Sequence, residues 1–253
     1  MERLKLLLLI GIMLLASGIQ AQENEVTQQA AQAYDTGDYI RAITLYEQAL
    51  MAQQNGSLYY NLGVAYYAEG DLGNALLNFR RAALYIPRDM ETQQAITQIR
   101  EERNDSFSGE ANGIYLVSDT LSRFMTVYEL AIVGLVLWSA GFAVLTLGLL
   151  RRKMKRFARI SAVGLGIILT LMLTAMGMMS FVQTQQPGGV VIAEEVQVMN
   201  GPGMDFLPLY MLHDAAEFRM IEQQGEWLRF VLTDGRQGWI ETNKIKLIPN
   251  NLG

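Results

Sequence analysis

Three stretches of the chain are strongly apolar. We expect a transmembrane helix over residues 129–150 and a second over 160–182, because their uncharged runs of 21 and 23 residues are long enough, at 1.5 Å per residue, to cross a hydrocarbon core of about 30 Å. The third stretch lies within residues 1–21, where a charged start precedes the apolar run and the small residue Ala21 ends it. This pattern is typical of a secretory signal peptide, with an uncleaved anchor as the alternative. Either outcome places the following residues outside the cytoplasm.

The connection between the two expected membrane helices, residues 151–159, is basic. Its six cations are Arg151, Arg152, Lys153, Lys155, Arg156 and Arg159. Short loops rich in lysine and arginine stay in the cytoplasm, and a nine-residue connection makes the two helices an antiparallel hairpin. Both ends of the hairpin then lie outside the cytoplasm, in agreement with the signal peptide. The alternative role of the basic loop is to bind an anionic lipid or an acidic cytoplasmic partner.

Residues 22–105 contain a self-match with a period of 33. Recurring pairs are Gly37 and Gly70, Ala42 and Ala75, Tyr46 and Phe79, and Ala49 and Ala82. The pattern resembles the tetratricopeptide repeat, a helix–turn–helix unit of about 34 residues. It predicts repeats at about 23–55 and 56–89, a capping helix at 89–103, and a linker at 106–128.

The resemblance assigns packing roles within the second repeat. Small residues let helices approach, Phe79 fills the space between them, and Pro87 ends the second helix; the small ones are Gly63, Ala75 and Ala82. Two repeats and a cap are fewer than the three or more that a solenoid usually needs. We therefore expect the module to lean on a second copy, on a partner, or on the membrane-proximal segment.

Repeats of this kind line a concave groove that holds peptides. By repeat position, the residues expected to face it are Tyr34, Tyr60, Val64 and Tyr67, with Asn61 nearby. These tyrosines are either binding anchors, since aromatic residues carry much of interface energy, or packing of a short solenoid. The groove positions lack lysine and arginine, which disfavours a clamp for peptide carboxylates.

Residues 188–250 change to an alternation of period two, which predicts five short strands and a small β-barrel. The string GEWLRFVLTDGRQGWI resembles bacterial SH3-type (SH3b) domains. In that family Trp227 and Trp239 stand at fixed places, either as core or as ligand contacts. His213 is expected in a solvated loop. The fold class is thus a multidomain α + β membrane protein, with an α-helical solenoid, a two-helix membrane hairpin and a small all-β barrel.

Composition removes most enzyme classes. The chain has no cysteine, so disulfides, thiolate metal sites and cysteine nucleophiles are excluded. His213 is the only histidine, which excludes zinc hydrolases that need two. The acidic pairs Glu101-Glu102 and Glu194-Glu195 are interpreted as solvated charge. We expect no enzyme activity, no metal and no organic cofactor.

Charge disfavours nucleic acid as a partner. Residues 22–120 carry 14 acidic and 6 basic residues, and residues 183–253 carry 9 acidic and 5 basic residues. Phosphate binding needs clustered lysine and arginine. The only basic cluster is the short connection between the two apolar runs.

The order of these segments resembles the BatE family of the Bat (Bacteroides aerotolerance) operons, most specifically at residues 58–88, 151–159 and 188–248. The resemblance implies a non-enzymatic scaffold or adaptor of the inner membrane, with its repeats and SH3-like domain in the periplasm. Implied partners are von Willebrand factor A-domain membrane proteins and a MoxR-type AAA+ ATPase, with a link to aerotolerance or stress survival; a homo-oligomer is a further possibility. The alternative is an envelope protein that binds peptidoglycan through the SH3-like domain.

Overall fold

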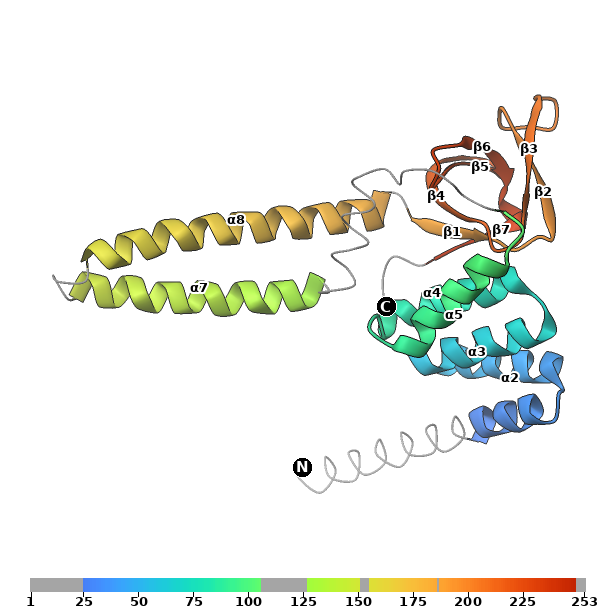
Figure 1. Ribbon diagram of the computed structural model, residues 1–253, viewed down its shortest axis with the longest axis horizontal. Helices are drawn as coiled ribbons and strands as arrows, with labels where there is room; N and C mark the ends of the chain where they lie inside the picture. Colours follow the sequence, from blue (N-terminus) through green and yellow to red (C-terminus); the bar gives the residue numbers. More distant parts are fainter. Residues whose placement is uncertain (1–24, 106–126, 151–154, 186, 249–253) are drawn as a thin grey trace, which may run out of the picture. The chain divides into compact units, whose positions relative to one another are not determined.

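A computed structural model describes residues 25–105, 127–150, 155–185 and 187–248 (Figure 1). The helices before residue 106 and the sheet after residue 187, apart from residues 231–236, fall in one compact unit, and the two long apolar helices fall in another. The predicted signal peptide, most of the predicted 106–128 linker, and Arg151, Arg152 and Lys153 lie outside the described residues. The mixed α + β class predicted from the sequence is confirmed.

Short helices joined by tight turns build the first part of the chain. They are residues 25–35, α2 (Tyr39–Ala52), α3 (Gly56–Glu69), α4 (Leu72–Tyr85) and α5 (Met90–Glu102). In each of α2 to α5, a capping side chain accepts a hydrogen bond from the backbone N–H three residues later, which satisfies one of the free donors of the first turn. The caps are Asp38, Asn55, Asp71 and Asp89. Gly37 and Gly70 have positive φ angles in the turns, a conformation that is cheap for glycine.

Small residues bring these helices close together. A Cβ atom added to Gly63 on α3 would lie 2.9 Å from the ring of Phe79 on α4, so the missing side chain makes room for the aromatic ring. Ala75 and Ala82 on α4 are fully buried. Pro87 is half-buried and follows the C-cap of α4, Ile86.

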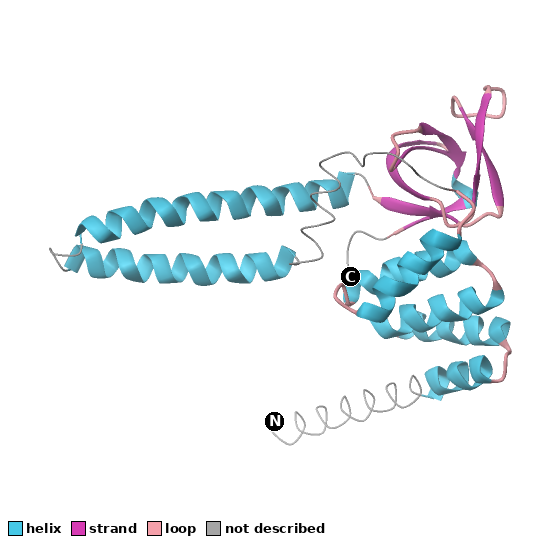
Figure 2. Ribbon diagram, in the orientation of Figure 1, coloured by secondary structure: helices cyan, strands magenta, loops and turns pink. Residues whose placement is uncertain are grey.

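The C-terminal part is a seven-stranded antiparallel sheet (Figure 2). Its strands are β1 (Gly188–Val191), β2 (Glu195–Met199), β3 (Pro208–His213), β4 (Glu217–Gln224), β5 (Trp227–Leu232), β6 (Gln237–Glu241) and β7 (Ile245–Leu247). Their order across the sheet is β3-β2-β6-β5-β4-β1-β7, and η2 (Thr242–Lys244) connects β6 to β7. Buried residues alternate along β5 and β6, which fills the core with Phe230, Leu228 and Ile240.

The expectation of five strands is therefore wrong. Strands β3 and β7 lie outside the set expected from period-two alternation. In β3 the large apolar residues Leu209 and Met211 are exposed while Leu212 is buried, so hydrophobicity does not alternate along this edge strand. Strand β7 has only three residues, too few for a periodic pattern to show.

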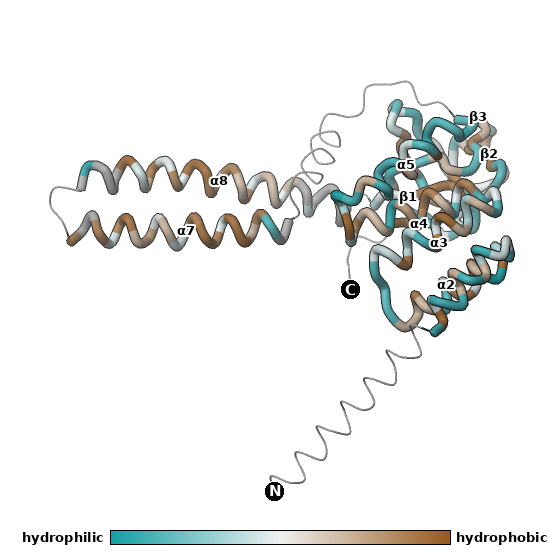
Figure 3. Tube along the Cα trace, turned by 60° about the horizontal axis from the view of Figure 1, so that its bottom comes forward, coloured by the Kyte–Doolittle hydropathy of each residue, from teal (hydrophilic) through white to brown (hydrophobic). Residues whose placement is uncertain are grey.

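The second unit contains two long apolar helices, α7 (Val127–Leu150) and α8 (Lys155–Gln185), which lie side by side in Figure 3. Within them, Glu129–Leu147 and Ile160–Met178 are long and apolar enough to span a membrane. The expected loop at 151–159 is shorter than predicted, because α8 already includes Lys155, Arg156 and Arg159. Lysine and arginine are good helix formers, so α8 begins several residues before its apolar segment.

Within the first unit, helix α4 packs against the sheet. Ala75, Leu76 and Phe79 of α4 share a hydrophobic core with Val190 and with two residues at the ends of strands, Ala215 and Ile248. The contact needs Gly73 on α4, where an added Cβ would lie 2.6 Å from the Val191 carbonyl oxygen. The support that two repeats lack thus comes from the sheet, which was not among the supports expected from the sequence.

Candidate functional site

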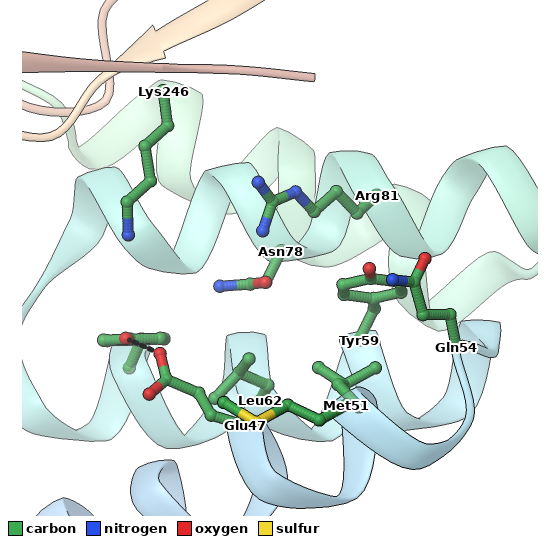
Figure 4. Close-up of a pocket in the computed structure, with 10 residues that line it drawn as sticks. Glu47, Met51, Gln54, Tyr59, Leu62, Asn78, Arg81 and Lys246 are labelled. Atoms are coloured by element: carbon green, nitrogen blue, oxygen red, sulfur yellow. Dashed lines mark hydrogen bonds between the residues drawn. The ribbon is translucent and has the colours of Figure 1, made fainter. Parts of the chain in front are cut away.

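A cavity of about 230 Å³ opens between α2, α3, α4 and the end of the sheet (Figure 4). Helix α2 contributes three residues, α3 three and α4 two; Gln54 follows the end of α2, and β7 contributes Lys246. The lining residues are Glu47, Leu50, Met51, Gln54, Tyr59, Leu62, Tyr66, Asn78, Arg81 and Lys246. Helices and sheet therefore build this site together.

Arg81 is the central cation of the cavity. Its guanidinium carbon lies 5.8 Å from the centre of the Tyr59 ring, in a cation–π contact. Its Nε atom is buried and has no hydrogen-bond partner, and Arg81 forms no ion pair with any described residue. Burial lowers the pKa of Arg81, against the opposing effects of Tyr59, Tyr66 and Glu47. The guanidinium remains charged even so, because arginine does not lose its proton in proteins.

Asn78 and Lys246 form the polar wall next to Arg81. The Asn78 side chain is 2% exposed, and its amide nitrogen donates to the Asn74 carbonyl oxygen at 2.8 Å. Its Oδ1 atom is buried and has no hydrogen-bond partner in the described ranges. Lys246 Nζ donates to Asn74 Oδ1 at 3.0 Å, which holds the ammonium group of the β7 lysine at the cavity.

The opposite wall carries one acid that is already engaged. The Tyr66 hydroxyl donates to Glu47 Oε1 at 2.8 Å. Burial and this hydrogen bond raise the pKa of Tyr66 well above its usual range, so the phenol keeps its proton. In Figure 4, Glu47 lies on one side of the cavity and both Arg81 and Lys246 lie on the other. The site offers positive charge and hydrogen bonds beside an apolar wall.

The residues predicted to face a groove lie on a neighbouring stripe of α3. Tyr60, Val64 and Tyr67 share one side of the helix, about a third of a turn from the cavity residues Tyr59 and Tyr66 at 3.6 residues per turn. The structure thus brings these three together, apart from the cavity.

Contacts within the chain hold the predicted groove tyrosines. The Tyr60 ring packs 5.4 Å from that of Phe79. The Tyr67 hydroxyl donates to Glu102 at 2.8 Å and accepts from Gln98 at 2.8 Å. Tyr34 lies on the first helix, with its ring 5.4 Å from that of Tyr39, and Asn61 is half-exposed on α3.

Trp227 and Trp239 are both half-exposed on the sheet. Leu228 and Phe230 alternate with Trp227 along β5 and are buried. Trp239 likewise lies between buried Gly238 and Ile240 on β6. Both tryptophans therefore lie on the strand face opposite the buried residues.

The expectation that His213 lies in a loop is wrong, because His213 is the last residue of strand β3. Its backbone N–H donates to Asp105 Oδ2 at 2.8 Å, and its Nδ1 atom lies 3.2 Å from Asp105 Oδ1. Pairing between β2 and β3 extends the strand to this residue, opposite Glu195. Among the described residues, no group of three or more histidine or acidic side chains is arranged to hold a metal ion.

A cluster of three arginines around Glu217 joins the helices to the sheet. Arg100 binds Glu217 through two hydrogen bonds of 2.6 and 2.8 Å. Arg80 and Arg103 lie 3.4 and 3.5 Å from the same carboxylate. Burial by itself would raise the pKa of Glu217, but the three arginines lower it to about 2. This cluster, which the sequence analysis missed, is a structural junction.

The connection between β2 and β3, with the start of β3, exposes large apolar side chains. Exposed fractions range from 42% to 74% for Met204, Phe206, Leu207, Leu209 and Met211. Exposed apolar surface of this kind often marks an interaction site. The run was visible in the sequence, but only the structure shows that it stays outside the core.

A scan against models of known protein families finds no match, and a search of curated proteins finds no similar sequence. Function must therefore be inferred from the geometry of this chain together with the resemblance of its segments.

Proposed function

We propose that this protein is a non-enzymatic scaffold or adaptor of the inner membrane, of the BatE type, with a tetratricopeptide-repeat module and an SH3-like barrel outside the cytoplasm. Helix pairs with the period of the repeat support the first module. The small seven-stranded sheet and the positions of its two tryptophans support the second.

The observation that carries the proposal is the packing of the helices and the sheet into one unit. Such a unit holds two binding modules in a constant relation, which suits an adaptor, because an ordered geometry reduces the entropy lost when a partner binds. It also agrees with the proposed topology. Helices precede α7 and the sheet follows α8, so both ends of a two-helix membrane hairpin must lie on the same side.

The proposed partners are von Willebrand factor A-domain membrane proteins of the Bat type, and a MoxR-type ATPase at the basic cytoplasmic connection. Deleting residues 22–105 to test this would uncover the core shared with the sheet. Substitutions on the surface of the full chain are therefore the better test. Asn61→Arg places a charge on the predicted groove, and Gln48→Arg places the same charge on an exposed position of α2.

The experiment is brief cross-linking of the tagged full-length protein in its own membranes, followed by identification of the co-purified proteins. We expect von Willebrand factor A-domain proteins to be recovered with the parent chain and with Gln48→Arg, and to be lost with Asn61→Arg. Equal recovery of these proteins with Asn61→Arg and with Gln48→Arg would show that the groove does not bind them. Absence of these proteins from the parent sample would contradict the family-based partner.

The alternative is peptidoglycan binding by the sheet, which the half-exposed Trp227 and Trp239 favour. Binding of the detergent-solubilised full chain to purified cell-wall sacculi tests it. Pelleting with the sacculi that Trp239→Ala abolishes would favour this alternative over the scaffold, whereas no pelleting would exclude it.

A further inference from the structure

Two neighbouring arginines of α4 have opposite surroundings. Arg80 lies 3.4 Å from Glu217 in the buried junction. Arg81 lines the cavity and has no carboxylate partner among the described residues. The one acid on the cavity wall, Glu47, is held by Tyr66 on the opposite side. The cavity therefore retains a cation whose natural partner, an anion, is not supplied by the described part of the chain.

The second cation in the cavity strengthens this asymmetry. Lys246 reaches the cavity from β7 and is held by Asn74. Arg81 and Lys246 outnumber Glu47, so the cavity has net positive charge even though the surrounding regions of the sequence are acidic. A single negative charge matches this excess.

Two buried polar atoms show which groups a ligand must present. Within the part of the chain that the structure describes, Arg81 Nε is a donor without an acceptor, and Asn78 Oδ1 is an acceptor without a donor. Buried polar groups in native proteins are almost always hydrogen-bonded, to protein, water or a ligand. A carboxylate would accept from Arg81, and a neighbouring N–H would donate to Asn78. Both groups occur together in one residue of a peptide, at its acidic side chain and its backbone amide.

The remaining wall of the cavity is apolar. Leu50, Met51 and Leu62 line it beside the cationic groups, and this surface suits the methylene stem of a side chain. The volume of about 230 Å³ accommodates one such side chain rather than a folded segment. A glutamate side chain has the required stem and the required single charge.

We propose that the cavity binds a glutamate side chain of a partner protein, with Arg81 and Lys246 receiving the carboxylate and Asn78 accepting a backbone N–H. This proposal deepens the proposed adaptor function by naming the chemistry of one partner contact. It places that contact on the face formed by α2, α3, α4 and β7, away from the groove residues Tyr60 and Tyr67.

The test uses the ¹⁵N-labelled full-length protein in detergent micelles. The readout is the Nε–H signal of Arg81, which Arg81→Lys identifies by its disappearance. The probes are a capped alanine–glutamate–alanine tripeptide, the matched alanine–glutamine–alanine tripeptide, and butyrate. Butyrate has a carboxylate and an aliphatic stem but no peptide N–H.

We expect the glutamate peptide to shift the Arg81 signal saturably, and the glutamine peptide to leave it in place. Butyrate should bind about tenfold more weakly, since it cannot satisfy Asn78. Lys246→Met should weaken binding of the glutamate peptide by about tenfold, because one charge-assisted contact is lost. Arg88→Gln, which removes an exposed arginine outside the cavity, should leave binding unchanged.

Three results would overturn the proposal. The first is no saturable shift with the glutamate peptide, in which case water alone satisfies the cavity. The second is equal binding of the glutamine peptide, which removes the role of charge. The third is equal binding of butyrate, which means that the cavity takes free carboxylates rather than a peptide. Recovery of partners by cross-linking is measured separately, so the adaptor function can stand if the cavity fails, and the cavity can stand if the adaptor function fails.

Discussion

Two sites of this protein, the junction at Glu217 and the cavity at Arg81, use arginine in opposite ways. At the junction, Arg80, Arg100 and Arg103 surround one buried carboxylate, Glu217. In the cavity, Arg81 faces a tyrosine ring and open space. Arg80 and Arg81 are adjacent on α4, so helix geometry directs one arginine towards the junction with the sheet and the next towards the cavity.

The presence or absence of a carboxylate partner distinguishes a structural role for arginine from a ligand-binding role. A buried ion pair whose partners are all present holds elements together, and removing one partner leaves an uncompensated charge. A cation without an anion contributes nothing comparable to folding and remains available to a ligand. We therefore expect substitutions at the junction to affect stability, and substitutions in the cavity to affect ligand binding.

The largest effect is expected for Glu217→Gln. The substitution leaves three arginines close together around a neutral amide, so we expect the junction to lose about 3–5 kcal/mol of stability. Hydrogen exchange of the sheet amides in the full-length protein measures this loss. Glu222→Gln is the matched control, because Glu222 pairs with Arg229 at a site where both side chains are more than 40% exposed, and we expect a cost of at most about 1 kcal/mol. Similar costs for both variants would contradict a structural role for Glu217.

Acid should weaken the same junction. The pKa of Glu217 lies at about 2, below the usual 4.5 of a glutamate, so its contribution to stability is complete above pH 4.5 and is lost as the pH falls towards 2. The shift corresponds to about 3 kcal/mol at neutral pH. Acid unfolding followed by tryptophan fluorescence tests this, since two of the three tryptophans lie in the sheet. The Glu217→Gln protein should lack this part of the pH dependence, and an unchanged acid transition would contradict the assignment.

A smaller effect is expected for Gly73→Ala. The new Cβ would meet the Val191 carbonyl oxygen and the Ile192 Cα atom, so helix and sheet must separate, at a cost of about 1–3 kcal/mol. Faster hydrogen exchange in β1 is the expected signature. Gly166→Ala is the control, because nothing lies within 4 Å of the added atom. Unchanged exchange in β1 would show that the close approach at Gly73 is unimportant for stability.

The smallest effect on stability is expected for Arg81→Gln. Removing this side chain also removes a buried donor without a partner, so we expect a change within about 0.5 kcal/mol in the thermal unfolding of the full chain. Arg100→Gln, which breaks the paired hydrogen bonds to Glu217, should cost about 1.5–3 kcal/mol. Equal losses of stability in the two variants would contradict the distinction between the junction and the cavity.

Local patterns predicted a large part of the architecture. The uncharged runs predicted two long apolar helices, and α7 and α8 cover both runs. Alternation predicted strands around Trp227 and Trp239, where β5 and β6 occur. These elements depend on side chains a few residues apart, so their signal is complete within a short window of sequence.

The candidate cavity could not be predicted in the same way. Arg81 and Lys246 are 165 positions apart in the sequence, and nothing near either residue indicates that they line one site. Glu217 gave no signal either, because its partners lie on α4 and α5, more than a hundred residues earlier. Gly73 was available as a clue, since glycine is uncommon inside helices, but what approaches it is a strand far along the chain.

The sequence by itself determined the two long apolar helices and five of the seven strands, because propensity and periodicity act over a few neighbouring residues. Tertiary structure decided which charges are satisfied. Burial and long-range packing placed Glu217 among three arginines and left Arg81 without a carboxylate partner among the described residues. Both are properties of contacts between distant segments. In the sequence, an arginine of the junction cannot be distinguished from the arginine of the cavity, because the carboxylate that pairs with it comes from a distant segment.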